Sequence, residues 1–163
     1  MKQIAAFVIL FSIVVNCHAQ KTSLPNIKVK SLDGKMIGIK EIQKEGKPMV
    51  ISFWATWCKP CVKELNSIND IFLDWQDEAD FQFVAVSIDD SRSQHNVAPF
   101  VKGRGWDYEV YLDTNSELKR ALNVVNVPHT ILFDKEGKMV WQHSGYSDGD
   151  EDDLFEQILK YTK

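Results

Sequence analysis

The sequence predicts an α/β protein in which a central sheet carries helices on both faces. Residues 48–54 and 81–88 are almost continuously apolar, as expected of strands buried in the middle of a sheet. Between them, residues 59–79 repeat apolar side chains every three or four positions, which is typical of an amphipathic helix. This strand–helix–strand order predicts a parallel pair of strands joined by a right-handed crossover.

Further strands and helices are predicted on either side of this unit. Residues 27–42 alternate around Asp33-Gly34, which predicts an N-terminal β-hairpin. The second half of the chain is predicted to add a strand, a helix, a β-hairpin and a closing amphipathic helix, at residues 108–112, 115–122, 130–143 and 150–161.

One more helix is predicted over residues 91–102, directly after the second buried strand. Ser91 is a suitable N-cap, and Gly103 is a suitable end for the helix. Pro99 lies within it and is expected to kink or shorten it, because proline lacks a backbone N–H.

Composition and charge exclude several classes of protein. The 163 residues are 44% hydrophobic and 26% charged, which suits one globular domain. The net charge of −4 argues against a polybasic nucleic-acid binder, so no nucleic-acid partner is expected. The three cysteines are too few for a disulfide-rich scaffold or for a zinc site built from cysteine pairs.

The first residues have the pattern of a secretory signal. Lys2 precedes an apolar run over residues 4–15, and the small residue Ala19 stands before a polar one. The apolar run is short for a membrane span. We therefore predict cleavage after Ala19.

This prediction divides the chain into a signal peptide, residues 1–19, and a single domain, residues 20–163, of an exported, periplasmic protein. The alternatives are a membrane anchor through an uncleaved N-terminus and lipid attachment at Cys17. If Cys17 is removed, Cys58 and Cys61 remain. A pair so close in sequence closes too small a loop to add much stability, so chemistry explains it better.

Cys58 and Cys61 stand where the helix predicted over residues 59–79 begins. A helix N-terminus presents unpaired N–H groups and a positive dipole end, so the pKa of the Cys58 thiol should fall. Cys58 is expected on the exposed lip and Cys61 one turn further in. Lys59 adds positive charge, and Pro60 stiffens the first turn, where its missing N–H costs nothing.

This asymmetry predicts a dithiol mechanism. The Cys58 thiolate attacks a substrate disulfide, and Cys61 then attacks the Cys58 sulfur and releases the reduced substrate. A reductant must later reopen the Cys58–Cys61 bond, and no cofactor is expected beyond this redox-active disulfide. The alternative is half of a metal site; zinc would need two further ligands, so no metal is predicted.

Residues 53–61, Phe-Trp-Ala-Thr-Trp-Cys-Lys-Pro-Cys, closely resemble the active-site segment of the thioredoxin superfamily. Residues 127–134, Val-Pro-His-Thr-Ile-Leu-Phe-Asp, resemble its cis-proline segment. The extra strand and helix within residues 81–122 and the exported N-terminus resemble the TlpA/ResA-like branch. The resemblance covers about residues 25–162. It implies a thioredoxin fold: a mixed sheet with an N-terminal β-hairpin and a central strand–helix insertion.

The resemblance also implies a substrate-binding surface. Pro128 would be cis and would face the cysteine pair, and the backbone of Val127 would pair with a bound substrate strand. Trp57 is expected to lie beside Cys58 and to shape the docking surface. From the residues alone, an ordinary trans turn proline at position 128 is the alternative.

Two positions depart from typical thioredoxins, and one of them is matched by a glutamate of the TlpA/ResA-like branch. Ser52 stands where they carry a buried acid on the strand. The TlpA/ResA-like branch instead uses a glutamate three residues after the second cysteine, and Glu64 stands there. The resemblance implies that Glu64 accepts the Cys61 proton, and the alternative is a solvated helix residue. Asn66 replaces the usual helix-kinking proline, which puts the bend of the helix in question.

Together these features predict an exported thiol–disulfide oxidoreductase that reduces protein disulfides. The resemblance suggests electrons from a membrane thiol carrier and a role in cytochrome c maturation. The alternatives are a disulfide oxidase or isomerase, and a non-catalytic module that only binds peptides. A peroxidase is disfavoured because Pro60 and Cys61 do not match the peroxidatic Thr-x-x-Cys pattern.

Overall fold

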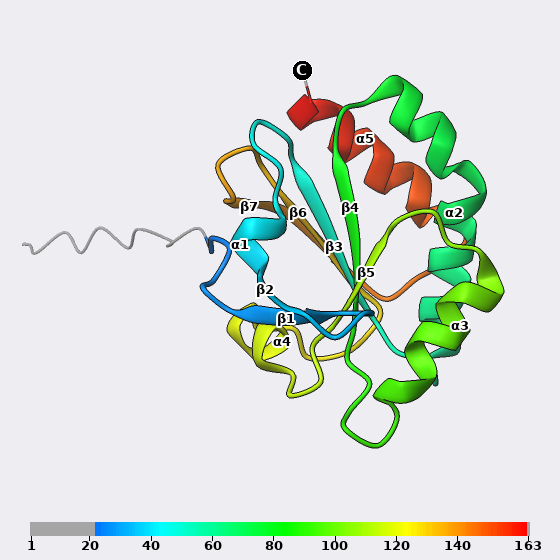
Figure 1. Cartoon of the computed structure of the whole chain (residues 1–163). Helices are drawn as coiled ribbons and strands as arrows, with labels where there is room; N and C mark the ends of the chain where they lie inside the picture. The colour runs from blue at the N-terminus through cyan, green and yellow to red at the C-terminus, as the bar shows by residue number, and fades with distance from the viewer. Residues whose placement is uncertain (1–21, 163) are drawn as a thin grey trace, which may run out of the picture.

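The computed structural model describes residues 22–162, so the predicted signal peptide and Cys17 lie outside the described residues. Its strands form one seven-stranded sheet in the order β2-β1-β5-β4-β3-β6-β7 (Figure 1). The three strands β3, β4 and β5 are parallel to one another, and the other neighbours pair antiparallel, so the sheet is mixed as predicted. The strands are β1 (Lys28–Ser31), β2 (Met36–Gly38), β3 (Met49–Trp54), β4 (Gln82–Ser87), β5 (Glu109–Leu112), β6 (His129–Phe133) and β7 (Met139–Ser144).

Helices cover both faces of the sheet (Figure 1). The two long helices α2 (Lys59–Glu78) and α5 (Asp150–Thr162) lie on one face together with α3 (Val97–Arg104). The short helices α1 (Ile39–Ile42) and α4 (Glu117–Ala121) cover the other. The predicted α/β architecture with helices on both faces is therefore confirmed.

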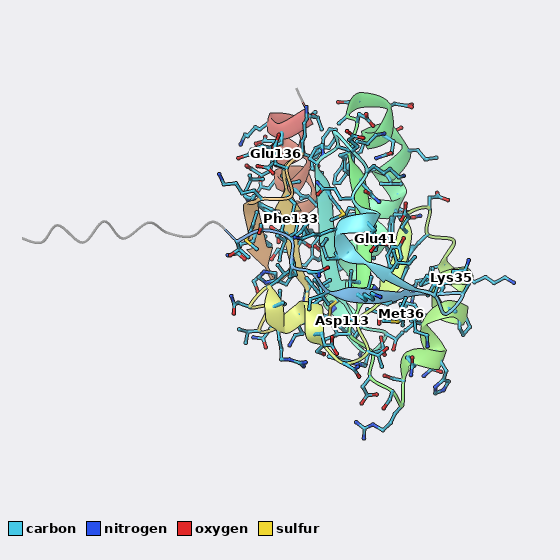
Figure 2. All side chains as sticks on the ribbon, turned by 60° about the vertical axis from the view of Figure 1, so that its left-hand side comes forward. Lys35, Met36, Glu41, Asp113, Phe133 and Glu136 are labelled. Carbon is cyan, nitrogen blue, oxygen red and sulfur yellow. A yellow bond between two sulfur atoms is a disulfide. The ribbon has the colours of Figure 1, made fainter. Side chains whose placement is uncertain are left out.

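The strand β3 lies at the centre of the molecule, and all six of its residues are buried. Successive side chains of a strand point to opposite faces, so β3 contributes to two cores. Val50 and Trp54 pack with α2 and α5, whereas Ile51 and Phe53 pack with α1 and α4. Figure 2 shows that side chains fill both layers, with Phe133 inside the second core.

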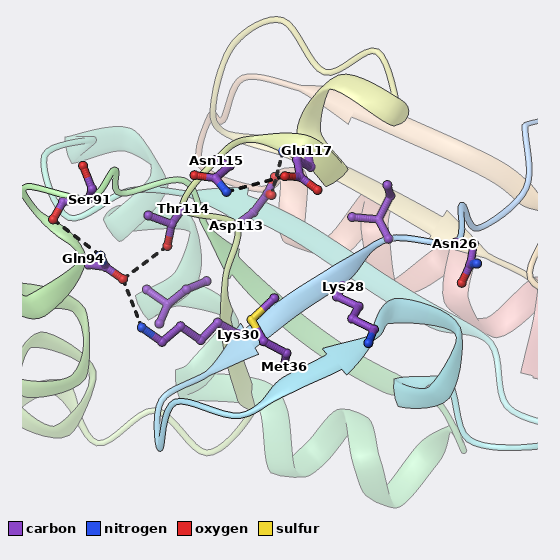
Figure 3. Close-up of a pocket in the computed structure, with 12 residues that line it drawn as sticks. Asn26, Lys28, Lys30, Met36, Ser91, Gln94, Asp113, Thr114, Asn115 and Glu117 are labelled. Carbon is purple, nitrogen blue, oxygen red and sulfur yellow. Dashed lines mark hydrogen bonds between the residues drawn. The ribbon is translucent and has the colours of Figure 1, made fainter.

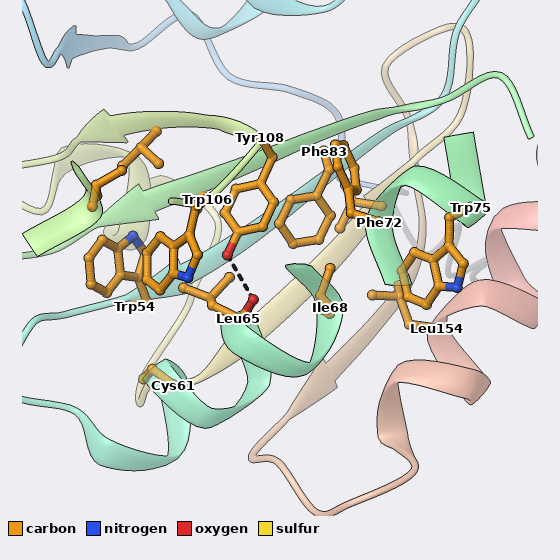
Figure 4. Packing of buried hydrophobic residues seen from close by; sticks show 14 of the residues in the cluster. Trp54, Cys61, Leu65, Ile68, Phe72, Trp75, Phe83, Trp106, Tyr108 and Leu154 are labelled. Atoms are coloured by element: carbon orange, nitrogen blue, oxygen red, sulfur yellow. Dashed lines mark hydrogen bonds between the residues drawn. The ribbon is translucent and has the colours of Figure 1, made fainter. Parts of the chain in front are cut away.

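Aromatic side chains dominate the core beneath α2 (Figure 4). Trp54 meets Trp106 edge-on, with ring centroids 4.9 Å apart. Tyr108 donates a hydrogen bond of 2.8 Å from its hydroxyl to the backbone oxygen of Leu65. Asn66 Oδ1 accepts a hydrogen bond of 3.0 Å from Trp106 Nε1. The helix α2 continues through Asn66 without interruption. The Asn66 side chain links the helix to the core through its hydrogen bond with Trp106.

The helix predicted over residues 91–102 begins and ends later than expected. Ser91 lies in a turn, and α3 begins at Val97, so the predicted N-cap is wrong. Pro99 is the third residue of α3, in the first turn, where no N–H is needed; it therefore restricts where the helix begins. The end predicted at Gly103 is also wrong. Gly105, with φ of 65°, provides the left-handed cap instead.

The predicted N-terminal hairpin is shorter than its sequence pattern suggests. The strand β2 ends at Gly38, and residues 39–42 form α1. Ile39 and Ile42 are both buried, and their spacing of three residues brings both side chains to one side of a helical turn.

The first residues that the structure describes, Thr22 to Leu24, are hydrogen-bonded to one end of the sheet. Met139 N donates a hydrogen bond of 2.8 Å to Thr22 O, and Leu24 N donates one of 2.8 Å to Gly137 O. Met139 pairs with Phe133, the residue of β6 that pairs with the first residue of β3. Thr22 and Leu24 therefore lie along the edge strand β7, at the end of the sheet where β3 begins. No helix within residues 22–162 has the length and apolarity to cross a bilayer.

Candidate active site at the carboxyl end of β3

Cys58 and Cys61 form a disulfide at the start of α2. The Sγ–Sγ distance is 1.99 Å and the Cα atoms are 5.3 Å apart. Cys58 is the N-cap residue of α2, and its sulfur accepts a hydrogen bond of 3.4 Å from the backbone N–H of Cys61. A sulfur at this position faces the unpaired N–H groups of the first helical turn, which stabilise a thiolate.

Cys58 is more exposed than Cys61, as predicted, but both side chains are buried. Cys61 is completely buried, whereas Cys58 retains an exposed fraction of 6%. The prediction that Cys58 lies open to solvent is wrong for this oxidised state, because its sulfur is bonded to that of the buried Cys61. Cys58 is nevertheless the more accessible of the two.

The first turn of α2 favours negative charge on Cys58. Lys59 and Pro60 are the first two residues of the helix, and both are exposed. Proline is tolerated there because an N–H at that position has no helical partner. The first turn contains no acidic residue, so no carboxylate offsets the positive end of the helix dipole.

A buried carboxylate holds the loop that leads into Cys58. Asp89 follows β4 and is completely buried. Its Oδ2 accepts hydrogen bonds of 2.9 Å from Thr56 N and 2.8 Å from Ser87 Oγ, and its Oδ1 accepts one of 2.6 Å from Thr56 Oγ1. Thr56 stands two residues before Cys58, so Asp89 positions the active-site loop. Asp89 was not among the site residues predicted from the sequence, although an acid directly after a buried strand is a usable signal.

The exchange Asp89→Asn is expected to lower the free energy of unfolding by about 1–3 kcal/mol, the usual cost of leaving a buried hydrogen-bonding group unsatisfied. Asparagine keeps the shape of the side chain but replaces one acceptor oxygen by a donor. Urea denaturation of the oxidised protein measures the change. The matched control is Asp107→Asn, because Asp107 is exposed and, within residues 22–162, its carboxylate makes no hydrogen bond. Equal losses in both variants would contradict this assignment.

Glu64 lies one helical turn after Cys61 and is buried, with an exposed fraction of 5%. Its Oε1 accepts a hydrogen bond of 2.8 Å from Thr130 Oγ1, while its Oε2 has no partner among the described residues. Burial raises the pKa of the Glu64 carboxyl to about 7, and the hydrogen bond from Thr130 opposes part of that rise. A group with this pKa exchanges protons near neutral pH.

The strand partner of β3 brings the proline segment to the same end of the sheet. The Val127–Pro128 bond is cis, as the resemblance implies. Phe53 pairs with His129, so Pro128 lies level with Trp54, where β3 ends and the active-site loop begins. Val127 packs against the core cluster that contains both cysteines.

The predicted site residues thus gather around one end of β3. Trp57, directly before Cys58, is exposed to 64%, whereas Trp54 is completely buried, as predicted. Within residues 22–162, no group of three or more histidine, cysteine or acidic side chains is placed to hold a metal ion.

A separate hollow lies away from the cysteines. It has a volume of about 670 Å³ and lies between the β1–β2 hairpin and the start of α4 (Figure 3). Gln94 Oε1 accepts hydrogen bonds of 3.3 Å from Lys30 Nζ and 3.4 Å from Thr114 Oγ1 in it. None of the predicted site residues lines this hollow. The candidate active site is therefore the region around the Cys58–Cys61 disulfide and not the hollow.

Comparison with known sequences gives one consistent family. The model of the AhpC/TSA family matches residues 21–142. Thiol-disulfide oxidoreductase ResA from Bacillus thuringiensis subsp. konkukian (strain 97-27) is 30% identical over 139 residues, which cover 85% of this chain and 74% of the relative. ResA from Bacillus subtilis (strain 168) is 31% identical over 123 residues, which cover 75% and 65% of the two chains.

Solved structures share the fold. A thioredoxin-like protein from Porphyromonas gingivalis matches with a TM-score of 0.75 and 42% identity, over 85% of this chain and 91% of that one. A thiol:disulfide interchange protein of the thioredoxin family from Chlorobium tepidum TLS matches with a TM-score of 0.67 and 27% identity, over 87% and 99%. With the Cys58–Cys61 disulfide at the start of α2, these similarities establish that the chain belongs to the AhpC/TSA family and is a ResA-like thiol–disulfide oxidoreductase with a thioredoxin fold.

Proposed function

We propose that this oxidoreductase works as a reductase of protein disulfides, with Cys58 as nucleophile and Cys61 as resolving cysteine. The observation that carries the proposal is the unequal placement of the two sulfurs. Cys58 caps α2 and keeps some exposure, whereas Cys61 is completely buried beside the turn that carries Glu64. An external disulfide therefore reaches Cys58 before Cys61.

In the proposed first step, the Cys58 thiolate attacks one sulfur of a substrate disulfide. A bond forms between Cys58 and that sulfur, and the other substrate sulfur leaves as a thiolate. Cys61 then loses its proton and attacks Cys58 Sγ, which releases the second substrate sulfur. Two electrons pass from the dithiol to the substrate, and the Cys58–Cys61 disulfide is the oxidised product.

Glu64 is proposed to accept the proton that Cys61 loses. A thiol buried among apolar side chains ionises poorly, so a nearby base is needed. Glu64 follows Cys61 by three residues on α2, and positions three apart face the same side of a helix. Its pKa of about 7 leaves an appreciable fraction of carboxylate at neutral pH while keeping it basic enough to take a proton.

The partners and the cellular setting are part of the same proposal. The signal-like pattern of residues 1–19 supports export to the periplasm, and an anchor through an uncleaved N-terminus or a lipidated Cys17 is the alternative. After each turnover a membrane thiol carrier would reopen the Cys58–Cys61 disulfide. The resemblance to the TlpA/ResA-like branch supports cytochrome c maturation as the process served.

Equilibration with glutathione buffers tests the direction of electron flow. We expect the Cys58–Cys61 pair to remain mostly oxidised at a potential of about −200 mV, because a reductase needs a more negative potential than that. Alkylation of free thiols and mass measurement give the oxidised fraction, and a Cys58→Ser, Cys61→Ser double variant is the blank. A potential near that of strong oxidants, about −120 mV, would instead indicate a disulfide oxidase.

A further inference from the structure

Two buried hydroxyl groups lie on the sheet beneath Glu64. Ser52 of β3 pairs in register with Thr130 of β6, and both side chains are almost completely buried. Ser52 stands between Val50 and Trp54, which both pack beneath α2, so its side chain points to the same face of the sheet. Residues directly opposite in an antiparallel pair have neighbouring side chains on one face, so Thr130 points there too.

Thr130 fixes the orientation of the Glu64 carboxyl. Its hydroxyl donates a hydrogen bond of 2.8 Å to Glu64 Oε1. Glu64 belongs to α2 and Thr130 to β6, so this bond joins the carboxyl on the helix to a strand of the core. Because Oε1 already accepts this hydrogen bond, Oε2 is the oxygen left to receive a proton.

The second oxygen of Glu64 and the hydroxyl of Ser52 are complementary groups. Within residues 22–162, neither Glu64 Oε2 nor Ser52 Oγ has a hydrogen-bond partner, and both atoms are buried. Buried polar atoms are rarely left unpaired, because the missing bond costs free energy. A hydroxyl donates to a carboxylate and accepts from a carboxylic acid, so Ser52 suits Oε2 in both of its protonation states.

The charges that face Glu64 from another element oppose its ionisation. Burial raises the pKa of Glu64 most, and the carboxylates of Asp150 and Glu151, at the start of α5, raise it further. The hydroxyls of Thr130 and Ser52 both lower this pKa, so they are the groups that favour the carboxylate. The titratable groups that face Glu64 or pair with its charged neighbours are Asp150, Glu151, Tyr108, His143 and Tyr146.

We propose that Thr130 and Ser52 are the positioning residues of the proton acceptor: Thr130 anchors Glu64 Oε1, and Ser52 is the hydrogen-bond partner of Oε2. The inference rests on the proposed function, because it concerns the step in which Cys61 loses its proton. In that step the Cys61 proton binds Oε2, a bond forms between Cys61 Sγ and Cys58 Sγ, and the substrate sulfur leaves Cys58 as a thiolate. Ser52 Oγ donates to Oε2 before this transfer and accepts the hydrogen of Oε2–H after it.

The first arm of the test measures the ionisation of Glu64 without any turnover. The NMR signal of the Glu64 carboxyl carbon is followed against pH in the oxidised protein, and Glu64→Gln assigns that signal. The pKa of Glu64 in the wild type is expected at about 7. Thr130→Val keeps the shape of the side chain but removes the donor, so the titration midpoint should rise by about one pH unit. Ser52→Ala should move it in the same direction.

Two further variants serve as controls for the titration. Thr130→Ser retains the hydroxyl and removes only a methyl group, so it should keep the wild-type midpoint. Thr114→Val makes the same exchange as Thr130→Val at a half-buried threonine in the hollow away from the cysteines, and it should leave the midpoint unchanged. An unmoved midpoint in Thr130→Val, or an equal rise in Thr130→Ser, would overturn the role of Thr130. An unmoved midpoint in Ser52→Ala would overturn that of Ser52, and this small exchange is informative even where Thr130→Val does not fold.

The second arm follows the step that these hydroxyls are proposed to support. The single-turnover release of substrate by Cys61 is measured against pH in the same variants. We expect the pH at which the rate rises to move upward in Thr130→Val by the same amount as the NMR midpoint, and to stay in place in Thr130→Ser. A raised NMR midpoint with an unmoved rate profile would overturn the inference together with the proposed role of Glu64. An unmoved midpoint, with release that still rises through pH 7, would overturn the inference alone.

Discussion

Replacing Cys58 with serine is expected to abolish the reduction of insulin disulfides. The serine hydroxyl is not ionised at neutral pH and cannot form a disulfide, so no mixed disulfide forms at all. Loss of a nucleophile typically lowers turnover by about a thousandfold or more. Insulin turbidity with dithiothreitol as the final reductant measures this loss, after subtraction of the reaction without protein.

The exchange Cys61→Ser is the matched control for that experiment. It changes the same atom by the same substitution but leaves the nucleophile in place. Because Cys61 would release the substrate, this variant should accumulate a covalent adduct at Cys58, visible as a mass increase equal to the substrate thiol. Full turnover by Cys58→Ser would refute the assignment of the nucleophile, and so would an adduct found on Cys61 of the wild type.

The exchange Glu64→Gln is expected to have opposite effects on activity and on stability. Glutamine fits the same space and still accepts the hydrogen bond from Thr130, but it cannot take a proton. The release of substrate by Cys61 should slow by about a hundredfold, as is common when a general base is removed. Single-turnover rates should rise through pH 7 in the wild type, where the pKa of Glu64 lies, and should lack that rise in the variant.

The stability effect follows from the same buried carboxyl. The pKa of Glu64 rises from 4.5 to about 7 on folding, so the folded protein binds the proton more tightly than the unfolded chain. The free energy of unfolding therefore falls as the pH rises from about 4.5 to about 7. At pH 8 the full penalty is about 3 kcal/mol, and at pH 4, below both values, it vanishes.

Glutamine is neutral at every pH, so Glu64→Gln should be more stable than the wild type by about 3 kcal/mol at pH 8 and similar to it at pH 4. Urea denaturation of the oxidised proteins at both pH values measures the difference. Glu78→Gln is the control, because Glu78 is exposed on the same helix. A wild type as stable as Glu64→Gln at pH 8 would show that the buried carboxyl carries no such penalty.

Long, strongly patterned segments were predictable from the sequence. The apolar run that became β3 and the three-and-four spacing that became α2 are local properties, and the structure reproduces both within one or two residues. The cysteine pair could be placed for the same reason, since it stands where that strand and helix meet. The cis state of Pro128 came from the resemblance, because backbone isomerism leaves no periodic pattern.

Features that depend on distant contacts were not predictable in this way. The hydrogen bonds between Asp89 and Thr56 join residues 33 positions apart, and they exist because β3 and β4 end side by side. The predicted ends of α3 were wrong for a different reason. Gly103 and Gly105 are both suitable ends, and only the packing of the finished helix decides between them.

The place where the first described residues join the sheet determines where a tether at the N-terminal side of the domain would be attached. Thr22 and Leu24 join the edge strand β7 at the end of the sheet where β3 begins, whereas the cysteine pair follows the carboxyl end of β3, about 17 Å further along that strand. A tether fused directly to Thr22, whether a lipid anchor, an affinity tag or a sensor surface, therefore attaches at the end of the sheet opposite to the cysteine pair.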